Sequence, residues 1–300
     1  MNVVASPSAS RPAGDGGAGG PGNSAPRIPP ATPREVTSWV YQLQEYPGGR
    51  LDKLAASPHQ LVVIDLARDA STSYFTRTEV GELQRRGKRV LAYFEIGSIE
   101  DFRPEYRAVR DRKLTLNEWS DWPGEYFVRY WERSWWDLAV KPRLDQAIAA
   151  GFDGVYLDTP LAYEEIDLKL VPGETRETLG RKMVELIVKI SRYAKSARQG
   201  FWVFPQNSPE LARYPGYTGA IDGIGMEELF FLATDEACTE DFCAENLAAT
   251  RGLREAGKLV LAVDYAEGPG NRAAACRRYR QERFVGYVTG VDLDDIRPHC

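Results

Sequence analysis

The chain has 300 residues, of which 43% are hydrophobic and 27% are charged, the composition of an ordinary globular protein. Its formal net charge is −5, which argues against the basic surface that nucleic-acid binding requires. No apolar run approaches the roughly 18 residues of a membrane-spanning helix. We therefore expect neither a nucleic-acid partner nor a transmembrane segment.

Histidine is scarce, and this scarcity restricts the chemistry. The chain has two histidines, His59 in a connecting stretch and His299 next to the C-terminus. Ser-His-Asp hydrolases, zinc proteases and histidine-rich metallohydrolases place histidine at the reacting atoms, and neither position suits that role. The sequence therefore predicts carboxylate chemistry, and we expect no metal and no cofactor.

The N-terminal segment differs in composition from the rest of the chain. Residues 1–33 contain seven Pro, six Gly, six Ala and four Ser, too few large apolar side chains to offset the entropy of ordering. We predict a disordered tail or linker over residues 1–35 and a single catalytic domain over 36–300. No signal peptide is visible, but such linkers are typical of exported bacterial proteins. We expect an extracellular or cell-envelope location, with the cytoplasm as the alternative.

After this segment, short apolar runs recur that are typical of buried parallel strands, because they are apolar on both faces. Eight runs are found, at residues 39–44, 61–67, 89–97, 154–159, 201–207, 221–229, 259–265 and 284–290. Helical periodicity separates many of them, at residues 78–86, 135–150, 175–197 and 239–256. Three of these helices are followed by a glycine, Gly87, Gly151 or Gly257, which favours a left-handed helix end.

Repeated strand–helix units predict a parallel sheet with right-handed crossovers. Eight of them in about 260 residues match the α/β class and the (β/α)8 TIM barrel in number and length. A doubly wound sheet is the second interpretation, but it usually has a glycine-rich loop after its first strand, and none is present here.

Carboxylates follow the apolar runs more often than capping alone explains. Five of the eight strands end in Asp or Glu: Asp65, Glu95, Asp158, Glu227 with Glu228, and Asp264. In TIM barrels the active site lies at these strand ends, and acidic groups within apolar runs are costly unless they are paired or functional. The sequence predicts an acidic catalytic cleft.

Clustered carboxylates without histidine allow either Mg²⁺ binding or glycoside hydrolysis. Five tryptophans fall between Trp119 and Trp136, and aromatic rings over a cleft stack on sugars. Among these aromatics, Trp122 and its neighbours lie among Gly, Pro and Asp and are cleft candidates, whereas Trp135 and Trp136 begin a helical pattern and are predicted to be core. Sugar chemistry is favoured.

The four cysteines, Cys238, Cys243, Cys276 and Cys300, lie in the last quarter of the chain. Three pairings are possible. Two disulfides, which would agree with an oxidising compartment, and buried free thiols both remain open.

Two segments carry a family resemblance. They are Tyr93-Phe94-x-x-Gly97-Ser98-x-Glu100, followed by Arg103, and Gly151-Phe-Asp-Gly-x-x-x-Asp158. Together with the order of the other runs over residues 38–295, they resemble glycoside hydrolase family 114, the endo-α-1,4-polygalactosaminidases and related barrels. The resemblance implies hydrolysis of α-1,4-linked galactosamine-rich polymers. The expected partner is a polysaccharide or oligosaccharide, and a cationic amino sugar in it would suit an acidic cleft.

The resemblance also implies a catalytic pair, Asp158 at the end of the fourth strand and Glu227 on the sixth. Asp158 would be the nucleophile or stabiliser and Glu227 the general acid/base. Glu228 is the competing position, and only one of the two can face the cleft. The family's Asn after the catalytic Asp is Thr159 here, which affects the expected sugar contacts. The expected substrate-binding residues are Tyr41, Asp65, Tyr93, Glu95, Glu100, Trp122, Tyr163, Asn207 and Asp264.

Two alternatives of other kinds remain at this point. One is a non-catalytic carbohydrate-binding barrel that has kept the fold without turnover. The other is a Mg²⁺-dependent barrel enzyme. We expect the protein to be a monomer.

Overall fold

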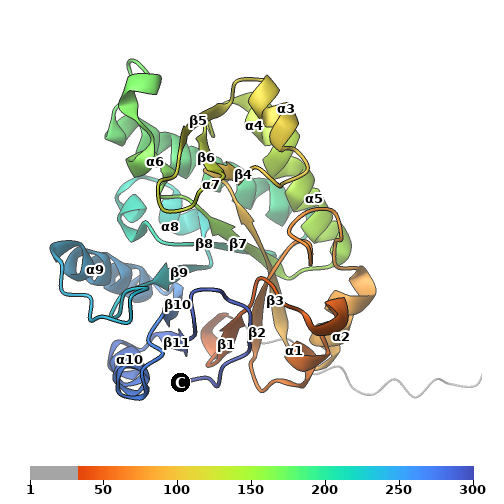
Figure 1. Ribbon diagram of the computed structural model, residues 1–300, viewed down its shortest axis with the longest axis vertical. Helices are drawn as coiled ribbons and strands as arrows, with labels where there is room; N and C mark the ends of the chain where they lie inside the picture. The colour runs from red at the N-terminus through yellow and green to blue at the C-terminus, as the bar shows by residue number, and fades with distance from the viewer. Residues whose placement is uncertain (1–32) are drawn as a thin grey trace, which may run out of the picture.

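The computed structural model describes residues 33–300, so nearly all of the predicted tail, residues 1–35, lies outside the described residues. Eight parallel strands form the centre of the molecule (Figure 1). They are β1 (Trp39–Tyr41), β2 (Leu61–Asp65), β3 (Arg89–Glu95), β7 (Gly154–Asp158), β8 (Trp202–Pro205), β9 (Gly223–Glu227), β10 (Leu259–Asp264) and β11 (Val285–Val288). All eight coincide with predicted runs, with shorter ends.

The eight strands form a ring in chain order. Hydrogen-bonded ladders join β1-β2-β3-β7-β8 and β9-β10-β11. The N–H of Asn207 donates to the oxygen of Gly225 at 2.7 Å and thereby links β8 to β9. The β1 strand packs beside β11, and Trp39 contacts Tyr287 with ring centroids 5.8 Å apart. The predicted (β/α)8 barrel is confirmed.

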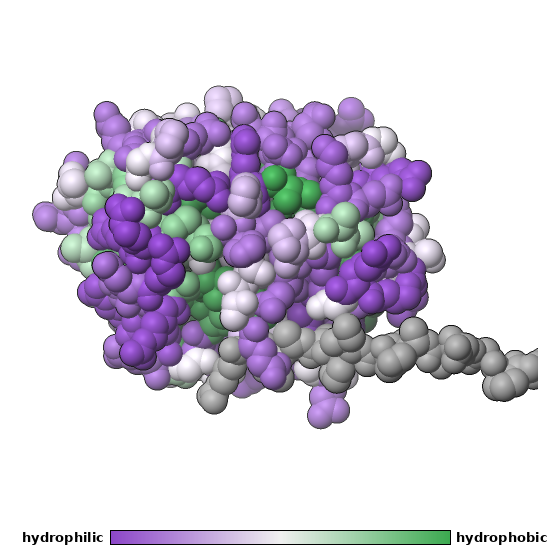
Figure 2. Space-filling view, turned by 90° about the horizontal axis from the view of Figure 1, so that it is seen from below, coloured by the Kyte–Doolittle hydropathy of each residue, from purple (hydrophilic) through white to green (hydrophobic). Residues whose placement is uncertain are grey.

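Helices surround this ring. The longer ones are α2 (Arg77–Arg85), α5 (Lys141–Ala150), α7 (Arg176–Ala197), α9 (Asp241–Glu255) and α10 (Pro269–Glu282), and the short ones are α1 (Asp52–Ala56), α3 (Tyr106–Asp111), α4 (Arg133–Trp135), α6 (Ala162–Glu165) and α8 (Tyr217–Ala220). Gly87, Gly151 and Gly257 have φ of 81°, 84° and 81°, so the predicted left-handed helix ends are confirmed. Figure 2 shows one face of the molecule, where hydrophilic residues surround small apolar patches.

An additional small sheet, which the sequence did not predict, follows β3. It consists of β4 (Ser98–Glu100), β5 (Thr115–Glu118) and β6 (Glu125–Val128), paired antiparallel in the order β4-β6-β5. The sheet lies near α3 at the top of Figure 1. The next segment of the chain contains Trp135 and Trp136, which are 0% and 7% exposed, so their predicted place in the core is confirmed.

Aromatic side chains fill the barrel interior. Tyr41 of β1 lies against Tyr156 of β7 with ring centroids 5.2 Å apart, and Trp39 stacks on both rings at 5.8 and 6.3 Å. Space for Tyr156 comes from Gly225 of β9, where an added Cβ would lie 1.9 Å from the tyrosine hydroxyl oxygen. The glycine is therefore required by packing across the barrel.

Replacing Gly225 by alanine is expected to lower the free energy of unfolding by about 1–3 kcal/mol or more, because a well-packed interior resists added volume. Gly252 of α9 is a matched control, since no atom lies within 4 Å of its added Cβ. There, alanine should stabilise the helix by up to about 1 kcal/mol. Urea unfolding of both variants checks this prediction, and equal effects would contradict it.

Two disulfides join residues near the C-terminal end of the chain. Cys238 pairs with Cys243, and Cys276 of α10 pairs with Cys300. Of the two states that the sequence left open, the structure therefore has the disulfides. Within residues 33–300, no helix is both long and apolar enough to cross a membrane.

Candidate active site

Asp158 and Glu227 are the last residues of β7 and β9, at the C-terminal end of the barrel. The residue after each has a left-handed backbone, with φ of 60° at Thr159 and 56° at Glu228. Asn207, which follows β8, also has a positive φ of 58°. Such backbone conformations are rare for residues other than glycine and cluster at functional sites. Strained turns thus follow three neighbouring strands at one mouth of the barrel.

The Asp158 carboxyl is held from two sides. Oδ2 accepts a hydrogen bond from the Tyr93 hydroxyl at 2.5 Å, and Oδ1 accepts one from the Thr159 N–H at 2.6 Å. Burial, followed by the negative charge of Glu227, raises the pKa of Asp158 to about 7, while these hydrogen bonds act in the opposite direction. Asp158 and Glu227 are therefore electrostatically coupled.

The Glu227 carboxyl has more partners. Oε2 accepts hydrogen bonds from the side-chain amides of Gln206 and Asn207, the latter at 3.0 Å. Oε1 contacts the Tyr265 hydroxyl. The N–H of Glu227 donates to Asn207 Oδ1 at 2.9 Å, so Asn207 binds both the main chain and the side chain of Glu227. Burial raises the pKa of Glu227 despite the hydrogen bonds from Tyr265 and Asn207.

Tyr41 and Tyr156 contact each other inside the barrel, with ring centroids 5.2 Å apart. Burial raises the pKa of each phenol, and the charges of Glu227 and Asp158 add to this effect. The Tyr41 hydroxyl donates to Gln206 Oε1 at 3.0 Å, and Gln206 in turn donates to Glu227. The Tyr156 hydroxyl is buried without a hydrogen-bond partner. Buried polar atoms without a hydrogen-bond partner are rare in folded proteins.

The competing residue, Glu228, does not share this environment. Its N–H donates to the oxygen of Val263 at 3.0 Å, and its carboxyl accepts a hydrogen bond from the Ala233 N–H. The side chains that bind Glu227 are not partners of Glu228. The geometry favours Glu227 as the member of the pair.

Three of the predicted sugar ligands form ion pairs with one arginine. Arg103 lies 3.1 Å from Asp65 Oδ2, 2.7 Å from Glu95 Oε1 and 2.6 Å from Glu100 Oε2. Asp65 and Glu95 are 2% and 1% exposed, and Arg143 also binds Glu95 at 2.9 Å. Burial and the charge of Glu95 raise the pKa of Glu100 to about 10. Asp65 and Glu95 therefore belong to a buried ion-pair network, and we correct their assignment as direct sugar ligands.

Asp264 also needs correction. It is fully buried, and its carboxyl accepts hydrogen bonds from the N–H groups of Phe230 and Phe231 and from the Tyr279 hydroxyl at 2.6 Å. In the β9–β10 register Glu227 is opposite Val263, so Asp264 points to the other face of the strand. Its role is to join the loop after β9 to α10.

The remaining predicted ligands are dispersed. Trp122 is 56% exposed in the turn between β5 and β6. Tyr163 of α6 is buried, and its hydroxyl binds Glu164 at 2.9 Å and also Glu210. Tyr41, Tyr93 and Asn207 are the predicted ligands that the structure places around Asp158 and Glu227 by the contacts given above.

Sequence reasoning missed Gln206 and Tyr265, and also Glu125, whose Oε1 lies 2.5 Å from the Ser98 Oγ, itself 3.0 Å from Thr159 Oγ1. It named Thr159 only as a departure from the family pattern. The alternation of strand residues could have identified Tyr265, because it lies two positions after inward-facing Val263. The other signals are weaker, since Gln206 and Thr159 look like ordinary residues of strand ends. Glu125 lies on a strand that was itself not predicted.

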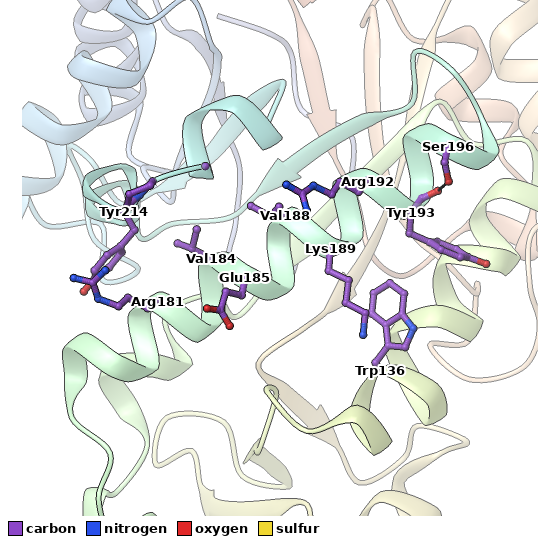
Figure 3. Close-up of a pocket in the computed structure, with 12 residues that line it drawn as sticks. Trp136, Arg181, Val184, Glu185, Val188, Lys189, Arg192, Tyr193, Ser196 and Tyr214 are labelled. Atoms are coloured by element: carbon purple, nitrogen blue, oxygen red, sulfur yellow. Dashed lines mark hydrogen bonds between the residues drawn. The ribbon is translucent and has the colours of Figure 1, made fainter.

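A large surface hollow lies elsewhere. It has a volume of about 1010 Å³ and follows the outer face of α7, where Lys189 lies 4.0 Å from the centre of the Trp136 ring (Figure 3). Arg181, Arg192 and Tyr214 also line it. It contains none of the predicted site residues, so it is separate from the mouth of the barrel.

The chain is similar in sequence and in fold to known proteins. Residues 22–300 match the profile of glycoside-hydrolase family GH114. A protein of Deinococcus radiodurans is 33% identical, covering 99% of this chain and 95% of the relative, and one of Methanocaldococcus jannaschii is 30% identical, covering 76% and 66%.

Among solved structures, Aspergillus fumigatus Ega3 in complex with galactosamine has a TM-score of 0.69 at 19% identity, covering 93% of this chain and 100% of that one. The glycoside hydrolase domain of Pseudomonas aeruginosa PelA has a TM-score of 0.66 at 20% identity, covering 87% and 97%. These two likenesses concern the fold, whereas the profile match extends over nearly the whole sequence. The chain belongs to glycoside-hydrolase family GH114.

Proposed function

We propose that this protein is a glycoside hydrolase that cleaves α-1,4-linked galactosamine-rich polysaccharide through the carboxyl groups of Asp158 and Glu227. The observation that carries the proposal is the pair itself. Two half-buried carboxyls end strands β7 and β9 at one mouth of the barrel, and the charge of Glu227, after burial, contributes to raising the pKa of Asp158 to about 7. Glycoside hydrolysis needs one ionised and one protonated carboxyl group, and such coupling favours this mixed state.

The hydrogen bonds support a division of roles. Asp158 receives donors on both oxygens, which suits an ionised nucleophile or stabiliser of an oxocarbenium-like transition state. Glu227 receives both amide donors on Oε2. Its Oε1 accepts a hydrogen bond from the Tyr265 hydroxyl alone, and rotation of that hydroxyl lets Oε1 carry the proton that the leaving group takes. Glu227 is therefore the general acid/base in this proposal.

An amino sugar is the substrate class that the charges favour. Asp158 is the ionised member of the catalytic pair, and a protonated amine gains from a neighbouring carboxylate. Ega3, whose fold this chain shares, was solved with galactosamine bound. The family resemblance of the Tyr93–Glu100 and Gly151–Asp158 segments points to the same sugar.

The direct test is incubation of the full chain with galactosamine polymer in deacetylated and acetylated form, with chitosan as the epimeric control, and product analysis by mass spectrometry. We expect oligosaccharides from the deacetylated galactosamine polymer. Cleavage of chitosan alone would contradict the sugar assignment, and binding without products would favour the carbohydrate-binding alternative. Loss of cleavage in chelator would favour the Mg²⁺-dependent alternative.

We also infer an oxidising location, outside the cytoplasm. The support is the pairing of all four cysteines in two disulfides, since disulfides persist mainly in extracellular and envelope compartments. A polymer substrate agrees with that location, because polysaccharide chains are met outside the cell.

A further inference from the structure

A third carboxyl group, that of Glu125, is connected to the turn after Asp158 through the hydroxyl groups of Ser98 and Thr159. Glu125 begins β6, is 8% exposed, and its Oε1 lies 2.5 Å from the Ser98 Oγ. The Ser98 Oγ lies 3.0 Å from the Thr159 Oγ1. Thr159 is the residue whose N–H donates to Asp158 Oδ1. The reaction as proposed above makes no use of Glu125.

Glu125, Ser98, Thr159 and Asp158 form a row of hydrogen-bonding groups, and the protons available between them can be counted. Thr159 Oγ1 accepts a hydrogen bond from the Gly97 N–H at 2.9 Å and donates its proton to the main-chain oxygen of Asp158 at 2.8 Å. A hydroxyl has one proton. Because Thr159 donates its proton to the main-chain oxygen of Asp158, the contact with Ser98 needs the proton of the Ser98 hydroxyl, which then has none left for Glu125. When each of these contacts is a hydrogen bond, the proton between Ser98 Oγ and Glu125 Oε1 comes from the carboxyl.

The surroundings of Glu125 agree with a neutral acid. If ionised, the side chain would place another buried charge close to Asp158, and buried charges are costly unless they are paired. Burial, followed by the negative charges of Asp158 and Glu95, raises the pKa of Glu125 to about 8, while the Ser98 hydroxyl and the charge of Arg103 act in the opposite direction. The geometric count and the electrostatics lead to the same protonation state at neutral pH.

We propose that Glu125 is a positioning residue that holds a proton and, through Ser98 and Thr159, fixes the turn that aims Asp158 at the substrate. The inference rests on the proposed function in one respect, the role of Asp158. Thr159 is β-branched and has φ of 60°, a conformation that persists only where its surroundings hold it. The row of hydrogen bonds from Glu125 supplies that support without adding a charge beside the nucleophile.

The proton can be observed without any turnover. We expect the infrared spectrum of the wild type at pH 7 to contain a protonated carboxyl band that is missing from Glu125→Gln and that disappears with a midpoint near pH 8. Glu118→Gln, on the neighbouring strand β5, is the matched control and should leave this band intact. A difference spectrum without that band at pH 7 would overturn the proposal.

The pH profile gives a second readout that a merely structural role would not produce. Asp158 acts as an anion, so activity rises with pH through its pKa. A glutamine amide can donate to Ser98 as the protonated acid does, so Glu125→Gln should keep near wild-type kcat/KM on its acid limb with an unchanged midpoint. Glu125→Ala and Ser98→Ala should each lose about tenfold, the effect of one broken buried hydrogen bond.

The opposite result is equally clear. If Glu125 were ionised, Glu125→Gln would remove a negative charge near Asp158 and move the midpoint of the acid limb to lower pH. That shift, or a loss in Glu125→Gln as large as in Glu125→Ala, would overturn the proposal. If the wild type cleaves no amino-sugar polymer, the proposed function fails, whereas the infrared titration still decides the protonation of Glu125.

Discussion

Replacing Glu227 by glutamine is expected to lower kcat on deacetylated galactosamine polymer by about 10²–10⁴-fold, the contribution typical of a general acid/base. Glutamine has nearly the same shape and can keep contacts with Asn207 and Tyr265, so the fold should remain intact. It cannot give a proton to the leaving oxygen. Product release followed by mass spectrometry measures the loss, and circular dichroism checks the fold.

Glu228→Gln is the matched control, because it changes the same functional group one residue further along the chain. Its carboxyl accepts from the Ala233 N–H and lies among different neighbours from Glu227. The variant should keep most of its activity. The charge of Glu228 contributes to raising the pKa of Glu227, so removing it should move the alkaline limb to lower pH. Equal losses in the two variants would refute the assignment of Glu227.

Replacing Arg103 by methionine should lower the free energy of unfolding by about 3–5 kcal/mol, because one partner of a buried ionic network is removed while the others stay buried. Asp65 and Glu95 are nearly inaccessible and receive charged donors from this guanidinium. Arg143 retains its contact with Glu95, whereas Asp65 loses its arginine. Urea unfolding at neutral pH measures the effect.

The free energy of unfolding should also depend on pH in a direction that the Arg103 network determines. Burial is the largest single effect on the pKa of Glu95 and raises it, but the charges of Arg103 and Arg143 together outweigh burial and hold this pKa well below its usual range. Stability from this group is therefore present above the unfolded pKa of Glu and lost as pH falls toward the folded value. In Arg103→Met the folded pKa of Glu95 rises toward the unfolded value, so the acid-dependent loss of stability should be smaller than in the wild type and should be complete at a higher pH.

Arg133→Met provides the comparison for Arg103→Met. Arg133 forms an exposed pair with Asp137 in which the side chains are 90% and 52% exposed, and exposed pairs contribute about 0–1 kcal/mol. If the two methionine variants lose similar stability, the Arg103 network does not have the structural importance assigned to it here.

Much of the fold could be predicted from local sequence. Runs apolar on both faces gave the eight barrel strands, and Gly87, Gly151 and Gly257 marked the helix ends because φ above 80° is unstrained without a Cβ. The α10 helix was missed, since its buried face consists of Ala275, Cys276 and Tyr279, a weak amphipathic signal among arginines. The β4-β6-β5 sheet was missed because its strands are short and partly polar.

The positions of the carboxyls show where local reasoning ends. Asp264 and Tyr265 are adjacent, yet only the register of β10 against β9 decides which of them shares a face with Glu227. Asp65 and Arg103 are 38 residues apart, and no spacing rule predicts that the arginine neutralises that aspartate. These contacts depend on how distant strands and loops are placed in three dimensions.

The sequence by itself determined a barrel with acidic residues at its strand ends, because apolar patterning and turn glycines act over a few residues at a time. The tertiary structure decided which acidic residues belong together. It brings Asp158 and Glu227 to one mouth of the barrel, each bound by a tyrosine hydroxyl. It pairs Asp65 and Glu95 with Arg103, turns Asp264 to the other face of its strand, and connects Glu125 to Asp158 through Ser98 and Thr159. The physical reason is that burial and charge coupling, which set the protonation of each carboxyl, depend on neighbours that are distant in the chain.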